Sequence, residues 1–97
     1  MNVNDAVKHF ADEHFRVLGY KYLTTYGKDN AIIKSIVLVY GLEETVKLIN
    51  EFFAWFPTES FYKQAGATVG VFKTQIPKLM AMKPTPEEKD NEKVGKL

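Results

Sequence analysis

The 97-residue sequence contains no cysteine, one tryptophan and four prolines. Without cysteine the chain can form no disulfide and has no thiolate to offer a metal, and this composition fits a cytoplasmic setting. No apolar run approaches the roughly 20 residues that span a membrane, and the N-terminus lacks the apolar core of a signal peptide. We therefore expect a cytoplasmic protein that has no contact with a membrane.

A large excess of one charge sign is also missing, because the formal net charge is only +1. This balance argues against a surface built as a whole to attach to nucleic acid or to anionic lipid. The charges are unevenly distributed along the chain, however. Residues 16–34 and 60–82 are mainly basic, and residues 43–59 are mainly acidic. The two basic segments would form a local cationic face if they lie on one side of the fold; the alternative is that their lysines are ordinary solvated residues.

What the sequence does contain is apolar residues at helical spacing, in a chain of the size that forms one core. The first helix is predicted over residues 4–18, with Asn4 as its N-cap and Gly19 at its end. Its apolar residues are Val7, Phe10, Ala11, Phe15 and Leu18. Residues 20–26 alternate and are rich in β-formers, which predicts an extended connector or a short strand.

The second helix is predicted to open at the turn Gly27-Lys28-Asp29, with Asp29 or Asn30 as its cap. Gly41 is expected to end it in the left-handed conformation. The apolar stripe of this helix is Ile32, Ile33, Ile36, Val37 and Tyr40.

A third helix is predicted over residues 43–56, and its apolar surface extends around two sides. A short helix capped by Thr58 should then run to Ala65 and stop at Gly66, and Thr68 should cap the last helix. Pro77 predicts a kink or an early end in that last helix. The expected fold is mostly α: a compact bundle of four to five short helices in one domain, residues 1–82, followed by a charged, disordered tail, residues 83–97.

Two features of this pattern favour nucleic acid as a ligand. The helix start at Gly27-Lys28-Asp29 could hold a phosphate on its free amides, with Lys28 adding a full charge and Asp29 competing for the same amides. Tyrosines also interleave with lysines around this turn, a combination that suits base stacking plus attraction to the backbone. The alternative is that the tyrosines cover the first two helices. The tyrosines concerned are Tyr20, Tyr22 and Tyr26.

Chemistry of other kinds finds little support in the sequence. His9 and His14 lie about 140° apart around the first helix, so they cannot bind one metal ion together. We expect His14 to be semi-buried and hydrogen-bonded, and His9 to face solvent. No Gly-rich phosphate loop, nucleophile elbow or recognisable acid pair is present. The predicted protein is not an enzyme and has no catalytic residue, metal, cofactor or small-molecule substrate.

The second apolar side of the third helix offers a different hypothesis. It consists of Leu48, Phe52 and Trp55. The following helices could cover this side, or it could bind another protein around an exposed tryptophan.

Several short motifs together resemble a small helical module of phage and prophage replication proteins. These motifs are Gly27-Lys28-Asp29, Tyr40-Gly41, Leu48-Ile49 with Phe52-Phe53, Ala65-Gly66, and Gly70-Val71-Phe72 with Gln75-Ile76. The resemblance spans roughly residues 8–80. In replisome-organiser and replication-initiation proteins the module usually follows a winged-helix region, and the resemblance implies a role in DNA or helicase-loader contacts. It also implies phosphate contacts at Lys28 and Lys34. This sequence holds no winged helix, so origin recognition is not implied, and Pro77 departs from the family's continuous last helix.

Two functions are therefore expected as alternatives. The first is weak, non-specific DNA binding in replication. Its predicted contacts are Lys21, Lys28, Lys34, Lys73 and Lys78, assisted by Tyr22 and Tyr26. The second is a protein-interaction module that acts on a replication or host-defence protein through Leu48, Phe52 and Trp55.

Overall fold

The structure is a computed structural model that describes residues 2–59 and 65–82. In this part of the chain it contains four α-helices, one short 3-10 helix and no strand. The elements are α1 (Val3–Leu18), α2 (Tyr26–Tyr40), α3 (Leu42–Trp55), η1 (Phe56–Thr58) and α5 (Val69–Met82). The expected class, a mostly α bundle of short helices, is confirmed. The predicted tail, residues 83–97, and most of the predicted short helix, residues 60–64, lie outside the described residues.

Helix α1 begins two residues earlier than predicted because Asn2, and not Asn4, is its N-cap. The Asn2 side chain accepts from the Asp5 amide at 3.0 Å, and the Asp5 carboxylate accepts from the Asn2 amide at 2.8 Å. This reciprocal capping box satisfies two backbone donors at the helix start. Gly19 ends the helix as predicted, with φ 83° and its N–H donating to the Phe15 carbonyl.

Gly41 forms the sharp corner between α2 and α3. Its φ of 86° was expected, but its ψ of 160° places it outside the left-handed helical region, in backbone space that is open to glycine almost alone. The Gly41 N–H donates to the Val37 carbonyl at 2.8 Å. Its own carbonyl accepts from the amide and the hydroxyl of Thr45 at 3.0 and 2.7 Å. One residue therefore ends one helix and begins the next.

Helix α5 begins after Thr68, as predicted. The Thr68 hydroxyl accepts from the Val71 amide at 3.1 Å. The helix then continues through Pro77 to Met82, so the predicted early end at Pro77 is wrong. Proline has no amide hydrogen to donate, and its ring clashes with a carbonyl of the preceding helical turn. Ile76 and Leu79 on either side of Pro77 are nevertheless buried in the core. This burial holds the chain in helical form on both sides of the proline.

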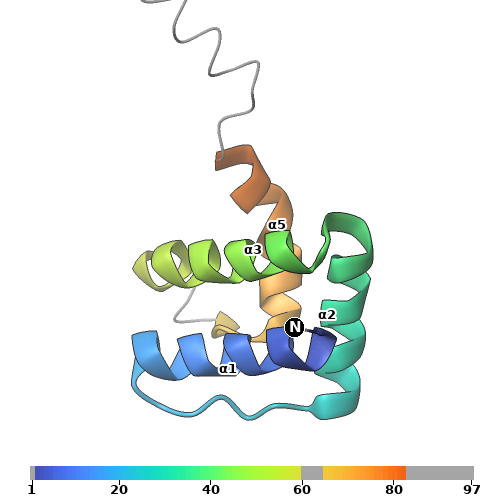
Figure 1. Cartoon of the computed structure of the whole chain (residues 1–97). Helices are drawn as coiled ribbons and strands as arrows, with labels where there is room; N and C mark the ends of the chain where they lie inside the picture. Colours follow the sequence, from blue (N-terminus) through green and yellow to red (C-terminus); the bar gives the residue numbers. More distant parts are fainter. Residues whose placement is uncertain (1, 60–64, 83–97) are drawn as a thin grey trace, which may run out of the picture.

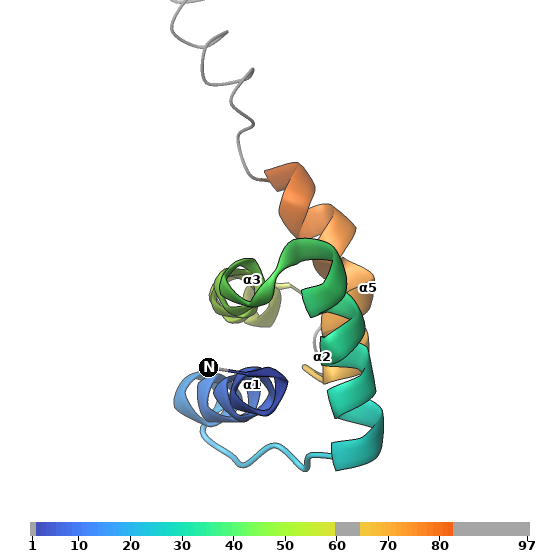
Figure 2. The same cartoon turned by 45° about the vertical axis from the view of Figure 1, so that its right-hand side comes forward.

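The helices form two crossed layers. Helices α1 and α3 lie side by side and run in the same direction. Helix α5 crosses behind them, and α2 stands upright at the ends where both begin (Figures 1 and 2). The connector between α1 and α2 runs back along the outer side of α1 (Figure 1). This route brings residues 20–25 beside the helix that precedes them. The connector is irregular and forms no strand, so of the two predicted alternatives only the extended connector is correct.

The core is an aromatic cluster around Phe10, which is completely buried. Its ring centroid lies 5.2 Å from that of Tyr22, 4.9 Å from that of Phe53 and 5.7 Å from that of Phe72. Edge-to-face contacts of this kind stabilise a core beyond the area that they bury. Residues from α1, α3, α5 and the connector therefore meet at one side chain.

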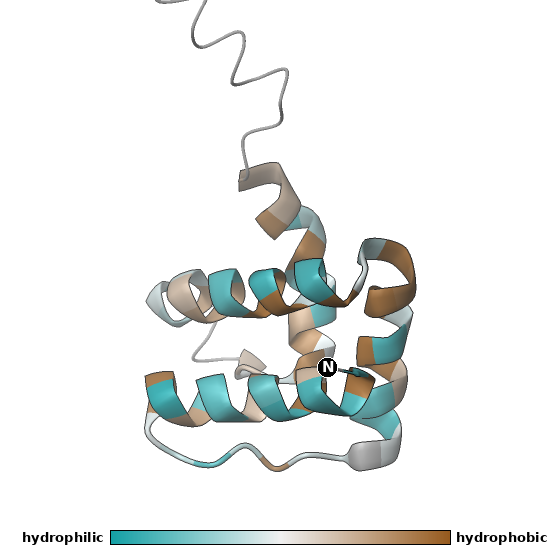
Figure 3. Cartoon of the chain, viewed as in Figure 1, coloured by the Kyte–Doolittle hydropathy of each residue, from teal (hydrophilic) through white to brown (hydrophobic). Residues whose placement is uncertain are grey.

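The outer surfaces of α1 and α3 are mainly hydrophilic, whereas the end of α2 is not (Figure 3). Leu38 and Val39 are exposed there, at 76% and 73%. Phe15 belongs to the apolar residues that recur at helical spacing in α1, yet it is 52% exposed, whereas His14 beside it is buried. No helix in residues 2–59 and 65–82 has the length and apolar character needed to cross a membrane.

Candidate nucleic-acid interface

The connector is held against α1 by His14. The Nδ1 atom of this buried side chain lies 3.1 Å from the Tyr20 carbonyl, which can only accept, so the ring donates. The two rings also meet edge to face, with centroids 4.8 Å apart. The expectation that His14 is hydrogen-bonded is confirmed, and its burial is more complete than predicted. These contacts fix the Tyr20 ring, which remains 55% exposed.

Tyr22 joins the connector to the first turns of two helices. Its hydroxyl donates to Asp29 Oδ2 in α2 at 3.0 Å and accepts from the Val69 amide of α5 at 3.1 Å. Burial, with Asp29 nearby, raises the pKa of Tyr22 to about 12. The phenol therefore stays protonated at neutral pH and can make both hydrogen bonds. The sequence left open whether the connector tyrosines stack on bases or cover the first two helices. For Tyr22 the second alternative fits best, because its hydroxyl bonds within the fold.

The start of α2 differs from the prediction. The N-cap is Thr25, so Gly27, Lys28 and Asp29 lie within the first turn and not before it. Asp29 is buried and accepts from the Thr25 amide at 3.0 Å as well as from Tyr22. It is not the cap, and it does not compete with a phosphate in the way that was expected. The Thr25 side chain makes no capping hydrogen bond, so it occupies none of the first-turn amides.

Asn4, predicted as the cap of the first helix, and Asn30, predicted as one of two possible caps of the second, bond to each other instead. Asn30 Nδ2 donates to Asn4 Oδ1 at 2.7 Å, which ties α2 to the first turn of α1. The sequence shows that both residues are of a type that caps helices. It does not show that the starts of the two helices lie side by side.

A hollow of about 480 Å³ opens where the connector meets the starts of α2 and α5. We call it the connector hollow. It contains Lys21, Lys28 and Tyr22 from the predicted DNA-binding set. It also contains residues at the start of α5 that the sequence reasoning did not assign to a site. These are Gly66, Ala67, Thr68 and Gly70. The glycine and threonine that mark the helix start were recognised as capping signals, but nothing in the sequence placed them beside Lys28.

The electrostatics of the connector hollow favour an anion. Lys21 and Lys28 contribute two positive charges, and the buried Asp29 contributes one negative charge that already accepts two hydrogen bonds. The first turns of α2 and α5 add the partial positive ends of two helix dipoles. Both helices are long enough for this effect, at 15 and 14 residues. The local balance is therefore positive in a protein whose net charge is close to zero.

The other predicted lysines do not line this hollow. Lys34 and Lys73 are exposed on α2 and α5. Lys78 lies 3.7 Å from a carboxylate oxygen of Glu59 and 4.9 Å from the centre of the Trp55 ring. It is thus already paired, which removes it from the set of lysines ready to bind a phosphate. The side chain of Tyr26 lies outside the described residues.

The predicted protein-binding surface on α3 needs a correction. Leu48 and Phe52 have no exposed surface because both pack in the core. They are unable to contact a partner in this structure, and the expectation for these two residues is wrong. Trp55 is partly buried against Phe56, with Lys78 over its ring. The following segment and α5 therefore cover most of the second apolar side of α3.

Both histidines make hydrogen bonds within the fold. His9 was predicted to face solvent. In the structure its Nε2 atom lies 2.7 Å from Asn50 Oδ1, so the side chain links α1 to α3. Within residues 2–59 and 65–82 no group of three His, Asp or Glu side chains could hold a metal ion.

Comparison with protein-family models, with curated proteins and with solved structures finds no match to this chain. The resemblance to the phage replication module therefore stays a prediction.

Proposed function

We propose that this protein binds nucleic acid weakly and without strong sequence preference, and that phosphates occupy the connector hollow. The observation that carries the proposal is the convergence of Lys21 and Lys28 with the first turns of α2 and α5 in one hollow. A phosphate there would meet two ammonium groups and the positive ends of two helices. No base-reading arrangement is needed for such a contact, so affinity would come mainly from charge.

A role in DNA replication, and in a phage in particular, rests on the family resemblance alone and is proposed on that basis. The proposal describes a cytoplasmic binding protein and not an enzyme. A protein-interaction function through Trp55 is the weaker alternative, since the two residues expected to flank Trp55 in that surface are buried.

The test is a titration of fluorescently labelled oligonucleotides, followed by anisotropy at about 50 and about 200 mM salt. With about two to four phosphate contacts, affinity should fall between about tenfold and a hundredfold over this range, at a slope near 0.9 per contact. Absence of binding at the lower concentration, or binding that salt does not weaken, would overturn the proposal.

Matched variants locate the contact. The Lys21→Gln, Lys28→Gln double change should weaken binding by about tenfold at low salt. The Lys34→Gln, Lys73→Gln double change removes the same charge outside the connector hollow and should have a clearly smaller effect. Equal losses in the two double variants would show that binding follows overall charge and not this hollow.

A further inference from the structure

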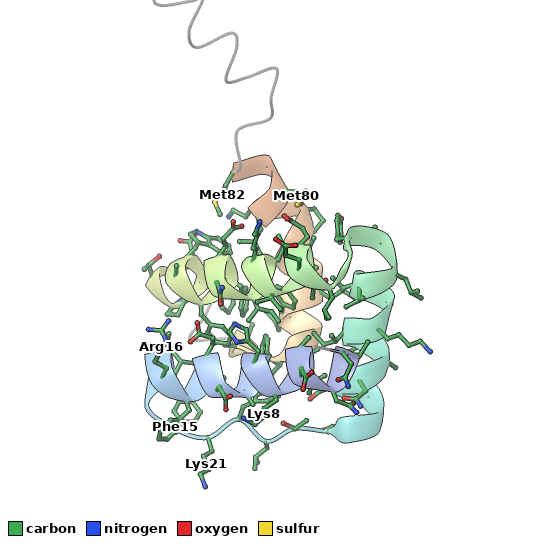
Figure 4. All side chains as sticks on the ribbon, in the orientation of Figure 1. Lys8, Phe15, Arg16, Lys21, Met80 and Met82 are labelled. Atoms are coloured by element: carbon green, nitrogen blue, oxygen red, sulfur yellow. The ribbon has the colours of Figure 1, made fainter. Side chains whose placement is uncertain are left out.

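Phe15 is a large apolar side chain that is half exposed on α1, and it is the starting point for a second inference. It lies on α1 next to the buried His14, yet half of its surface is open. Figure 4 shows the Phe15 side chain beside the connector, on the same side of the molecule as Lys21. An aromatic ring and a lysine thus share the surface where the connector passes α1.

Three hollows follow one another along this connector. The connector hollow shares Lys21 and Tyr22 with a second hollow of about 450 Å³, which is also lined by Phe15. The second hollow shares Ala11 and Thr24 with a third, of about 530 Å³, near the start of α1. Neighbouring hollows therefore share lining residues, and we call the row of three hollows along the connector the path. Its extended form suits a chain-like ligand better than a compact one.

The formal charges along this path balance, because Lys8, Lys21 and Lys28 are matched by Asp5, Asp12 and Asp29. Lys21 lines both of the first two hollows. Asp12 lines the second, where its carboxylate lies 3.3 Å from the ammonium group of Lys8. Asp5, in the third hollow, is engaged in the capping box of α1. Asp12 is therefore paired with a lysine, and Asp5 and Asp29 accept hydrogen bonds, while Lys21 and Lys28 have no acidic partner among the ion pairs of the described residues.

We propose that this path binds single-stranded nucleic acid, with unpaired bases stacking on Phe15 and Tyr20 while Lys21 and Lys28 contact phosphates. This inference rests on the proposed nucleic-acid function and specifies its ligand. Single strands are recognised by a positive groove together with exposed aromatic rings. A duplex keeps its bases stacked on each other and would lose a few kcal/mol for each step that it opens, so these rings favour single strands over a duplex.

The two rings are suited to this role in different ways. Tyr20 is held by its contact with His14, so little freedom is lost when a base stacks on it. Phe15 projects from a regular helix and is positioned by the helix backbone. Lys21 follows Tyr20 in sequence and lines both the hollow that contains Tyr20 and the hollow that contains Phe15, so it is placed to contact a phosphate that joins stacked bases.

The experiment compares single-stranded DNA, single-stranded RNA and duplex DNA of equal length, about ten nucleotides, which lies within the usual range of site sizes. Wild-type protein should bind single strands more tightly than duplex, and the DNA and RNA arms show which sugar is preferred. Phe15→Leu keeps an apolar side chain but removes the ring, and it should weaken single-strand binding about fivefold or more. Phe15→Tyr keeps the ring and should bind like wild type.

Leu38→Ala changes an even more exposed apolar residue away from the path and serves as the control. Circular dichroism checks that every variant is folded. Equal affinity for single strands and duplex, together with wild-type binding by Phe15→Leu, would overturn the inference and leave the proposed function standing. Equally effective competition by polyphosphate, which has no bases, would also overturn it. Absence of binding to all three nucleic acids would instead reject the proposed function, and the inference with it.

Discussion

Replacing Tyr22 by phenylalanine removes a single oxygen atom that joins three parts of the fold. The hydroxyl donates to the Asp29 carboxylate at 3.0 Å and accepts from the Val69 amide at 3.1 Å. A hydrogen bond to a charged group contributes about 1.5–3 kcal/mol, and a buried amide left without a partner costs about 1–3 kcal/mol. Tyr22 is only partly buried, so water can replace part of this loss. We expect Tyr22→Phe to lower the free energy of unfolding by about 2 kcal/mol.

This loss would be large for a domain whose total stability is roughly 4–12 kcal/mol. Urea denaturation followed by circular dichroism measures it directly. Tyr20→Phe is the matched control, because the Tyr20 ring is largely exposed, and it should change stability by less than about 0.5 kcal/mol. A double-mutant cycle with Asp29→Asn should give a coupling energy of about 0.5 kcal/mol or more. A Tyr22→Phe variant as stable as wild type would refute the role assigned to this hydroxyl.

Three further predictions follow from the same structure. Because the pKa of Tyr22 is raised to about 12 in the folded protein and lies near 10 in the unfolded chain, the unfolded state releases its proton first, so stability should fall between about pH 10 and pH 12. Urea titrations across this range should show a smaller fall for Tyr22→Phe than for wild type. Phe10→Ala should cost about 3–5 kcal/mol in a urea titration, since it empties the centre of the aromatic core, and a cost below about 1 kcal/mol would contradict that position. Gly41→Ala should lower the melting temperature and reduce the free energy of unfolding by about 1–3 kcal/mol, because the φ angle of Gly41 is 86°. Gly27→Ala should instead raise the free energy of unfolding by about 0.4–1 kcal/mol, because Gly27 lies in a helical turn with open space around it. Losses of equal size at both glycines would contradict this reasoning.

The sequence by itself determined the helical class and most of the helix ends. Gly19, Gly41 and Thr68 act where they were predicted to act, because backbone conformation and capping depend on a few adjacent residues. The buried positions of α1 were predicted less well. His14 and Phe15 are neighbours at the border of the apolar stripe, and a helical pattern does not show which of the two faces the core.

Only the tertiary structure decided where the candidate site lies. Tyr22 and Val69 are 47 residues apart, and no local pattern relates them. The site exists because the connector runs back along α1 and brings Lys21 and Lys28 to the start of α5. The same packing buries Leu48 and Phe52, which the sequence had also allowed as part of a partner surface. Which apolar side of a helix is covered depends on the path of the rest of the chain, and that path is a property of the whole fold.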